Sequence, residues 1–549
     1  MARPVRCAPV HSDAVAVIDG TAGRSALRAL HRARRRRYLL DVDWVDALYK
    51  AYLTAIVAAA AVFFGSRLFG TDRVTAAELA DVRRFGPGAL GLAVAVAIAA
   101  GLRSGSRGGP LALEPSDVTH VLLAPVPRAT VLRRAASSQA RGVLLVGAVV
   151  GAVAGNLAAF RLPGERAAWV ACGVAFGTLA VLAAWAAALI ACGSRMSTRT
   201  ATAVGILLIG WSAADLALAA RSSFGSALAR LALLPVASGP AAIAGAIVAA
   251  VVTLAVTAAA LARIGDSSVE AAERRARLVG ELRFAATLQD VRTVIVLHRQ
   301  LAQQLPRSRP WFGSGERGGR RSQPVTGLRA CWRRDWQGVA RWPGNRLLRQ
   351  LVLGLLAGTA LAAAWNGTPA LVLAAGIALF LAGLDATEGL AQETDHPIIA
   401  AGIPIAWGRL LLRHLLAPAA LVLLAELAGF VVVAVFSGTA TALEVSALVL
   451  LPAALAATAG AAAAVVLGAP SATLQTFGSQ MGLPELSMML VLLRQVFPPA
   501  MAVLAVAPVA VAERTGSGAV AAAAGALVVP VLAVAGVVVW IGTRKLRTA

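Results

Sequence analysis

Lysine is almost absent from this chain of 549 residues, in which only Lys50 and Lys545 occur. A P-loop ends in a lysine that reaches the β- and γ-phosphates of a nucleotide. Residues 46–49 (DALY) precede Lys50 and residues 541–544 (IGTR) precede Lys545, so neither lysine ends such a loop. The chain therefore carries no Walker-type ATPase of its own, and any nucleotide energy must come from a partner.

Motifs for metal binding and catalysis are also missing. The four cysteines form no CxxC pair, the six histidines are spread along the chain, and neither HExxH nor GxSxG occurs. The sequence therefore predicts no catalytic residue, no metal site and no cofactor, and it argues against an enzyme. A net charge of +24 lacks the aromatic interleaving of a nucleic-acid-binding module, so nucleic acid is not an expected partner.

Long runs of Ala, Val, Leu and Gly dominate the remainder. Apolar residues make up 58% of the chain, and the mean hydropathy is +0.74. A membrane-spanning helix needs about 20 predominantly apolar residues. The sequence therefore predicts an all-α polytopic membrane protein with about twelve spans. These are 51–69, 86–102, 142–160, 167–192, 202–220, 240–263, 348–364, 369–384, 414–436, 443–467, 495–512 and 518–542.

The arginines set the orientation, because cytoplasmic loops collect positive charge. With both termini inside, the cytoplasmic segments hold 42 of the 51 Lys and Arg residues. We therefore expect a multi-pass protein of the cell membrane with both termini in the cytoplasm and membrane lipid around it.

Five segments follow from this pattern. A basic cytoplasmic arm (1–50) precedes a first six-span half (51–263). A basic linker (264–349) follows, with two expected amphipathic helices, one at 268–305 and one around Trp332, Trp336 and Trp342, which we interpret as an interfacial anchor. A second six-span half (350–542) and a cytoplasmic tail (543–549) complete the chain.

Each half has a substantial cytoplasmic loop between its second and third spans. The first contains Glu114, Asp117, Pro125, Pro127 and Arg128, and the second contains Asp385, Glu388, Asp395, Pro404 and Arg409. Both loops therefore have the same order, an acidic helix start, then a proline-bearing turn, then an arginine-studded entry into the next span. Halves in the same orientation would form a parallel repeat about an axis along the membrane normal.

At these two loops the chain resembles the membrane permeases of type-two ATP-binding-cassette (ABC) exporters, especially large actinobacterial-like members with fused six-span halves. The resemblance implies that a short helical segment in each loop meets a separate ATPase. Six residues are the candidates for this coupling, either by contacting the ATPase or by bracing the helices that do: Glu114, Asp117, Arg128, Glu388, Asp395 and Arg409. The long central linker and the N-terminal arm depart from the better-known members, and the substrate is not indicated.

Few polar residues lie inside the spans. Asp215 and Glu426 are the clearest, and Asn156 and Trp211 are plausible polar neighbours along a translocation path. A charge near the bilayer centre is costly, so each acid should face the bundle interior. A substrate path, a proton carrier and a structural hydrogen-bond partner remain open for both. Gly147, Gly151 and Gly155 have the small-xxx-small spacing of closely packed helices.

Three functions follow from these observations. An ABC-exporter permease agrees best with the paired loops and the scarcity of intramembrane charge. An ion-driven secondary transporter and a membrane scaffold without transport are the alternatives.

Overall fold

The computed structural model describes residues 73–276, 310–312, 327–396, 402–467, 484–515 and 518–545, apart from short gaps within these ranges, together with residues 29, 32 and 33. Its regular structure within these ranges is entirely helical, as the sequence predicts. Ten described helices are long and apolar enough to cross a membrane, and the bent pair formed by α14 and α15 makes up to eleven. The prediction of an all-α polytopic membrane protein is therefore confirmed, while the count of twelve stays a prediction. The expected span 51–69 lies outside the described residues, as does most of the expected amphipathic helix 268–305.

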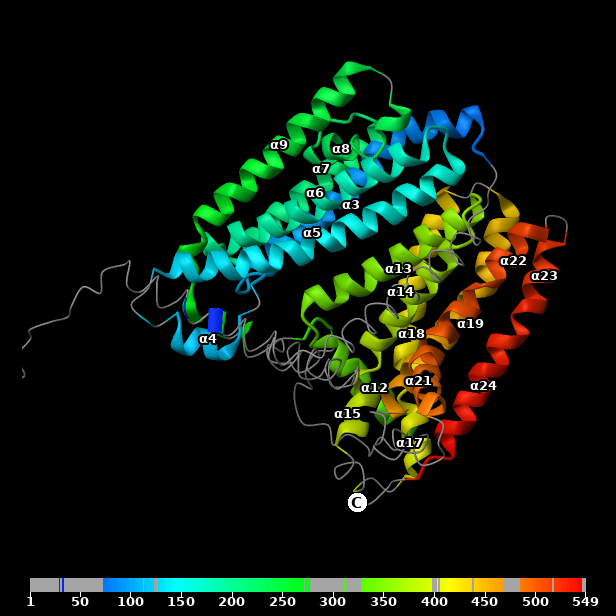
Figure 1. Ribbon diagram of the computed structural model, residues 1–549. Coiled ribbons are helices and arrows are strands. Elements are labelled where there is room, and N and C mark those ends of the chain that lie inside the picture. Colours follow the sequence, from blue (N-terminus) through cyan, green and yellow to red (C-terminus); the bar gives the residue numbers. More distant parts are fainter. Residues whose placement is uncertain are drawn as a thin grey trace, which may run out of the picture. The chain divides into compact units, whose positions relative to one another are not determined.

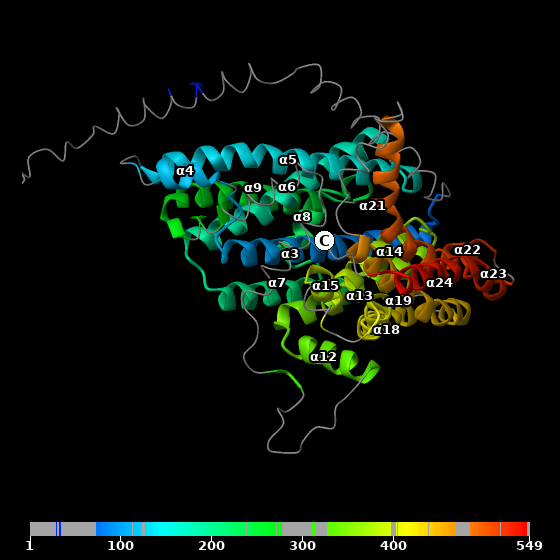
Figure 2. The same cartoon turned by 90° about the horizontal axis from the view of Figure 1, so that it is seen from below.

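The helices fall into two compact units that divide near residue 283. The long helices of the first unit run side by side in two views (Figures 1 and 2). The described helices of this unit are α3 (Ala76–Gly105), α4 (Pro115–His120), α5 (Arg128–Arg161), α6 (Arg166–Gly193), α7 (Thr198–Leu218), α8 (Phe224–Ala229) and α9 (Pro240–Ala262), with the short 3₁₀ turns η1 (Leu234–Val236) and η2 (Ile264–Asp266).

In the described part of the second unit, four helices are short and seven are longer. The helices of fewer than ten residues are α15 (Glu388–Asp395), α17 (Trp407–Arg413), α22 (Pro508–Thr515) and α23 (Ala519–Ala526). The longer helices are α12 (Leu328–Ala340), α13 (Gly344–Trp365), α14 (Leu371–Ala386), α18 (Leu416–Phe436), α19 (Ala440–Leu467), α21 (Pro484–Val506) and α24 (Val528–Gly542).

The second predicted span begins ten residues earlier than the sequence pattern indicates. Helix α3 starts at Ala76, where Thr75 and Glu78 form a capping box. The Thr75 backbone N–H donates to Glu78 Oε2 at 2.6 Å, and the Glu78 backbone N–H donates to Thr75 Oγ1 at 3.3 Å. These bonds satisfy donors that a helix start leaves without partners. The helix then continues through Pro87, which hydropathy alone placed at its beginning.

Glycine faces set the closest helix contacts in both units. In the first unit, a Cβ added at Gly151 of α5 would collide with the Gly173 carbonyl of α6. In the second, a Cβ added at Gly358 of α13 would collide with the Gly429 carbonyl of α18. The expectation that the α5 glycines serve helix packing is confirmed, because the backbones approach where side chains are absent.

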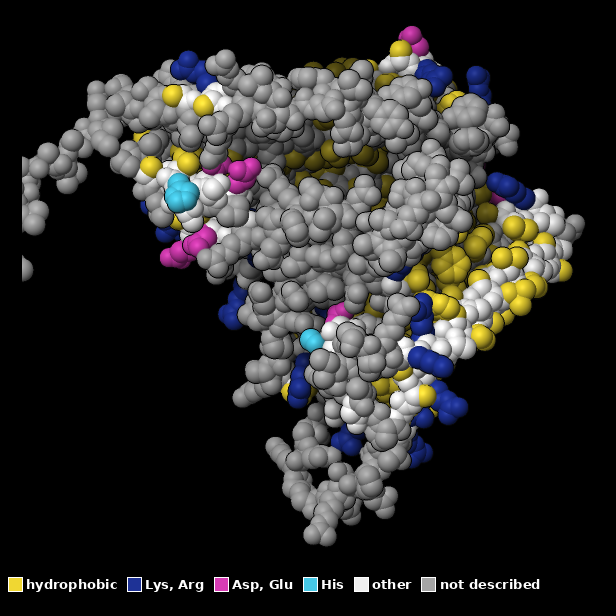
Figure 3. Space-filling view, turned by 60° about the horizontal axis from the view of Figure 1, so that its bottom comes forward, with side chains coloured by type: hydrophobic (Ala, Val, Ile, Leu, Met, Phe, Trp, Pro, Cys, Tyr) yellow, Lys and Arg dark blue, Asp and Glu magenta, His cyan; other side chains and the backbone are white. Residues whose placement is uncertain are grey.

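The outward surface of the spans is apolar. Leu145, Val150, Leu207, Val435 and Leu532 are each more than half exposed. Apolar side chains also cover much of the described surface in the space-filling view (Figure 3). An apolar surface of this extent is stable against lipid rather than water.

Candidate functional site

Helix α15 of the second unit lies at the centre of a polar network. Helix α14 ends at Ala386, and the chain turns by 57° into α15. Thr387 stands at the turn, where its backbone N–H donates to the Gly383 carbonyl. The bend directs α15 away from the α14 axis and brings Glu393 against α12, which also packs on α17 and α18.

Glu388, the first residue of α15, is held from within the unit. Arg346 at the start of α13 forms an ion pair with its carboxylate, and Trp342 Nε1 donates to Glu388 Oε2 at 3.0 Å. The Arg346 guanidinium also lies 3.8 Å from the centre of the Trp342 ring. Because the Arg346 side chain is only 7% exposed, the carboxylate provides the compensation that a buried cation requires. Glu388 therefore ties the start of α15 to α13 and to Trp342.

A second pair joins α13 to the end of α14. Arg349 forms an ion pair with Asp385, in which its Nη2 donates to Asp385 Oδ1 at 2.6 Å. Two arginines on one face of α13 therefore hold both sides of the α14–α15 bend.

The other end of α15 is joined to α12 and to the loop before α18. Arg334 of α12 forms an ion pair with Glu393, and His414 Nδ1 lies 2.8 Å from Asp335 Oδ1. The His414 side chain is fully buried, and its Nε2 lies 3.9 Å from Glu393 Oε1. A Cβ added at Gly389 would collide with the Asp335 carboxylate, so glycine permits this approach of α12 to α15. The network contains a cavity of about 50 Å³.

Helix α4 of the first unit occupies the matching place in the chain, between α3 and α5. Its apolar side packs through Val118, Val121 and Leu122 into a cluster with Leu132 and Leu189. Its polar side faces outward, and acidic and histidine side chains gather on the surface around it (Figure 3).

The coupling candidates have different environments. Glu114 stands at the N-terminal cap of α4, Arg128 begins α5, and both are exposed. Asp117 is half-buried in the first turn of α4. Asp395 at the end of α15 and Arg409 in α17 are exposed.

The polar candidates in the spans have separate environments. In the first unit, Asn156 Oδ1 accepts a hydrogen bond from Arg166 Nε at 2.7 Å, across the turn between α5 and α6. Trp211 Nε1 donates to Ser222 Oγ at 2.9 Å, and that hydroxyl donates to Asp215 at 2.7 Å. In the second unit, Glu426 lies on α18, buried among apolar residues.

Sequence reasoning missed five members of the α15 network, namely Arg334, Asp335, Trp342, Arg346 and His414. Trp342 and Arg346 belong to the Trp- and Arg-rich stretch that the sequence pattern indicated as an interfacial anchor. The structure corrects this interpretation for Trp342, which is only 4% exposed and bonds to Glu388. Asp385 and Glu388 in the following loop were the available signal that the arginines before the span pair with acidic residues of the same unit.

Comparisons with protein families, with curated proteins and with solved structures find no match to this chain.

Proposed function

We propose that this chain is the permease subunit of an ABC-type exporter, which forms the translocation path and takes energy from a separate ATPase. The supporting observation is the matching place of two short helices. Helix α4 follows α3 and precedes α5, and helix α15 follows α14 and precedes α17 and α18. A dimeric ATPase presents two equivalent surfaces, and a fused permease needs one cytoplasmic contact for each.

The packing partners of the spans support two related halves. In the first unit α3 contacts α6 and α7, α5 contacts α6, and α6 contacts α9. In the second unit α14 contacts α19 and α21, α18 contacts α19, and α19 contacts α24. Each of these contacts has its counterpart at the same place in the order of helices, whereas the contacts of α19 with α21 and of α14 with α18 have no equally extensive counterpart in the described first unit. Twelve spans in two parallel six-span halves, with both termini in the cytoplasm, account for this order and for the arginine distribution.

The α15 network gives this proposal a mechanical element. Force applied at the exposed end of α15, near Asp395, passes through Glu393 to α12 and through Glu388 to α13. Buried ion pairs resist separation because each charge left alone carries a large desolvation cost. Helix α15, which we propose as the docking helix of the second unit, therefore moves together with the spans α13 and α14. Glu114, Asp117 and Arg128 in the first unit, with Asp395 and Arg409 in the second, are the proposed ATPase contacts.

An ion-driven secondary transporter is the second candidate, and the buried carboxyl of Glu426 is the observation that favours it. The two candidates differ in one requirement, because only the first needs an ATP-binding partner at both α4 and α15.

Site-specific cross-linking tests that requirement. A photoreactive amino acid is placed at position 114 or position 395 of the full chain, and native membranes are illuminated and probed with a photoreactive ATP analogue. The proposal predicts one adduct, of the same ATP-binding protein, from both positions. Matched controls are Glu165 and Glu444, which are exposed carboxylates at the opposite ends of spans. The coupling role would be refuted if neither position 114 nor position 395 gave an ATP-binding adduct, or if the control positions gave equal adducts.

A further inference from the structure

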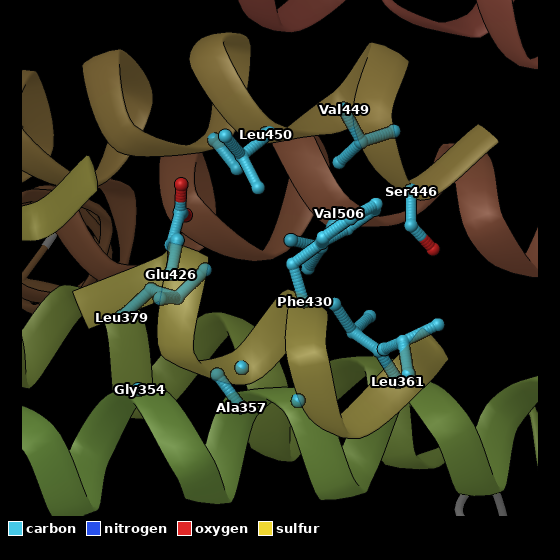
Figure 4. A pocket seen from close by; sticks show the side chains of 14 residues that line it. Gly354, Ala357, Leu361, Leu379, Glu426, Phe430, Ser446, Val449, Leu450 and Val506 are labelled. Carbon is cyan, nitrogen blue, oxygen red and sulfur yellow. The ribbon is translucent and has the colours of Figure 1, made fainter. Parts of the chain in front are cut away.

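A cavity of about 30 Å³ lies in the second unit, where α13, α18 and α19 meet (Figure 4). Helices α14 and α21 contribute one lining residue each, Leu379 and Val506. Glu426 of α18 and Ser446 of α19 are the polar side chains of the lining, and the others are apolar or glycine. A water molecule needs roughly 10–15 Å³ of such space, so this cavity has room for one or two.

Both polar groups of the cavity lack partners among the residues that the structure describes. Glu426 is 7% exposed and Ser446 is 6% exposed. Within that part of the chain, neither carboxyl oxygen of Glu426 has a hydrogen-bond partner, and neither does the Ser446 hydroxyl. A buried polar group without a partner costs about 1–3 kcal/mol, so such a pair indicates a ligand that the protein itself does not provide.

Charges on the neighbouring helices do not line the cavity. Helix α13 has Arg346 and Arg349 in its first two turns, five or more residues before Gly354, its first lining residue. The other described charged groups on elements around the site are Arg329, Arg333, Arg334 and Asp335 on α12, Asp385 on α14, Glu444 on α19, Arg494 on α21, and Glu513 and Arg514 on α22. Among the described residues, an ionised Glu426 would therefore stand in apolar surroundings without a counter-ion, at a cost of several kcal/mol.

The size and the donor set decide the ligand. The Glu426 carboxyl offers two side-chain oxygens, and Ser446 lies at the other end of the lining (Figure 4), whereas a calcium ion takes six to eight oxygen ligands. A proton needs only the carboxyl group, and a water molecule in the cavity can accept a hydrogen bond from the acid. We propose that Glu426, with cavity water, forms a proton-binding site inside the second unit.

The place of this site couples the proton to helix packing. Glu426 follows Ala425 and precedes Gly429, the two residues of α18 that the α13 backbone approaches at Gly354 and Gly358. Ionisation of Glu426 introduces a charge beside the crossing of α13 and α18, and this charge draws water toward the crossing. Protonation removes the charge and the need to hydrate it. Proton binding thus favours close packing of α13 on α18. The inference does not depend on an ATPase partner.

Infrared difference spectroscopy of the full chain in lipid nanodiscs tests the proposal. The spectrum of the native chain minus that of Glu426→Gln isolates the one carboxyl group. At neutral pH we expect the carbonyl stretch of a protonated acid, which shifts in D₂O and gives way to carboxylate bands as the pH rises. The matched control Glu444→Gln removes an exposed carboxylate from α19, and its difference spectrum should contain carboxylate bands alone. Glu426→Asp retains an acid, so the protonated band should move rather than vanish.

Three results would overturn the site. Carboxylate bands at neutral pH in the Glu426→Gln difference would mean that no proton is bound there. A protonated band unaffected by pH and by D₂O would mean a sealed structural group. Conversion to carboxylate bands when sodium chloride replaces choline chloride at constant pH would assign the site to a metal cation.

Discussion

Asp215 in the first unit and Glu426 in the second are both buried carboxyls on long apolar helices, but their environments differ. Asp215 accepts hydrogen bonds from the Ser222 and Ser223 backbone N–H groups and from the hydroxyls of Ser222 and Ser226. These donors form the turn and first residues of α8, whose N-terminal cap is Ser223. Glu426 has no hydrogen-bond partner in the described chain. Asp215 therefore fixes a loop, and Glu426 is available to a ligand.

The contrast teaches that burial alone does not identify a functional acid. A carboxylate with four donors is stabilised where it stands, and its replacement should damage the fold. A buried carboxyl without hydrogen-bond donors destabilises the folded state, and the protein tolerates this cost. Its replacement should therefore impair only ligand binding and the function that depends on it. Thiol labelling can follow each unit separately in single-cysteine variants. Cys172 and Cys192 lie in the first unit and Cys331 in the second. Cys331 is buried, and burial raises the pKa of its thiol, so labelling of this thiol should be slow until the second unit unfolds.

The largest effect is expected at Asp215. Asp215→Ala should lower the free energy of unfolding of the first unit by about 3–5 kcal/mol, because each buried donor left without an acceptor costs about 1–3 kcal/mol. The measurement is the denaturant dependence of thiol labelling at Cys172 or Cys192. The exposed Glu165→Ala, in the same unit, is the control. A loss below about 1 kcal/mol would remove the assigned structural role.

Glu388 should come second, because its partner Arg346 is also buried. Glu388→Ala should cost the second unit roughly 3 kcal/mol, since it leaves a buried guanidinium without its counter-ion. A double-mutant cycle with Arg346→Met should recover part of this loss, because removing both charges removes the desolvation cost. Labelling of Cys331 reports the unfolding. Additive effects of the two substitutions would contradict the brace.

Replacement of Glu426 should leave stability nearly unchanged. Glu426→Gln should alter the free energy of unfolding of the second unit by less than about 1 kcal/mol, because it breaks no protein hydrogen bond. Cys331 labelling again serves as the measurement, with Glu388→Gln as the variant that loses a charge partner. Suppose that Glu426→Gln lowers the free energy of unfolding of the second unit as much as Asp215→Ala lowers that of the first unit. Both acids would then serve the fold, and the proposed difference between them would be wrong.

The smallest effect on stability is expected from substitutions at the proposed ATPase contacts at α4 and α15. Reversing Glu114 and Asp395 together should change unfolding by less than about 0.5 kcal/mol, since both side chains are exposed. The same variant should lose the ATP-binding partner on purification. A large stability loss would mean that these residues serve the fold rather than a partner.

Long helices were predictable because their signal is local. Apolar runs of about 20 residues define a span wherever they occur. Of the eleven predicted spans from 86–102 onward, ten coincide with helices that are long and apolar enough to cross a membrane, and 369–384 falls on α14 of the bent pair. The start of α3 was missed because the capping box at Thr75 acts through two hydrogen bonds, which hydropathy does not register.

The site was predictable only in part, because partners come from distant positions. Asp215 and Glu426 have similar apolar neighbours in sequence. The two acids differ because the serines after α7 donate hydrogen bonds to Asp215, and they reach it only when the loop folds back. Arg346 and Glu388 are joined across 42 positions of the chain. No spacing rule connects such residues before the helices pack, so the sequence indicated Glu388 as important and left its partner unnamed.

The most direct test of the exporter proposal is cryo-electron microscopy of the full chain, purified from native membranes with its bound partners. The account predicts two nucleotide-binding subunits on the cytoplasmic face, one in contact with α4 near Glu114 and one in contact with α15 near Asp395. An ATPase bound elsewhere, or a purified chain with no ATPase at either helix, would contradict it.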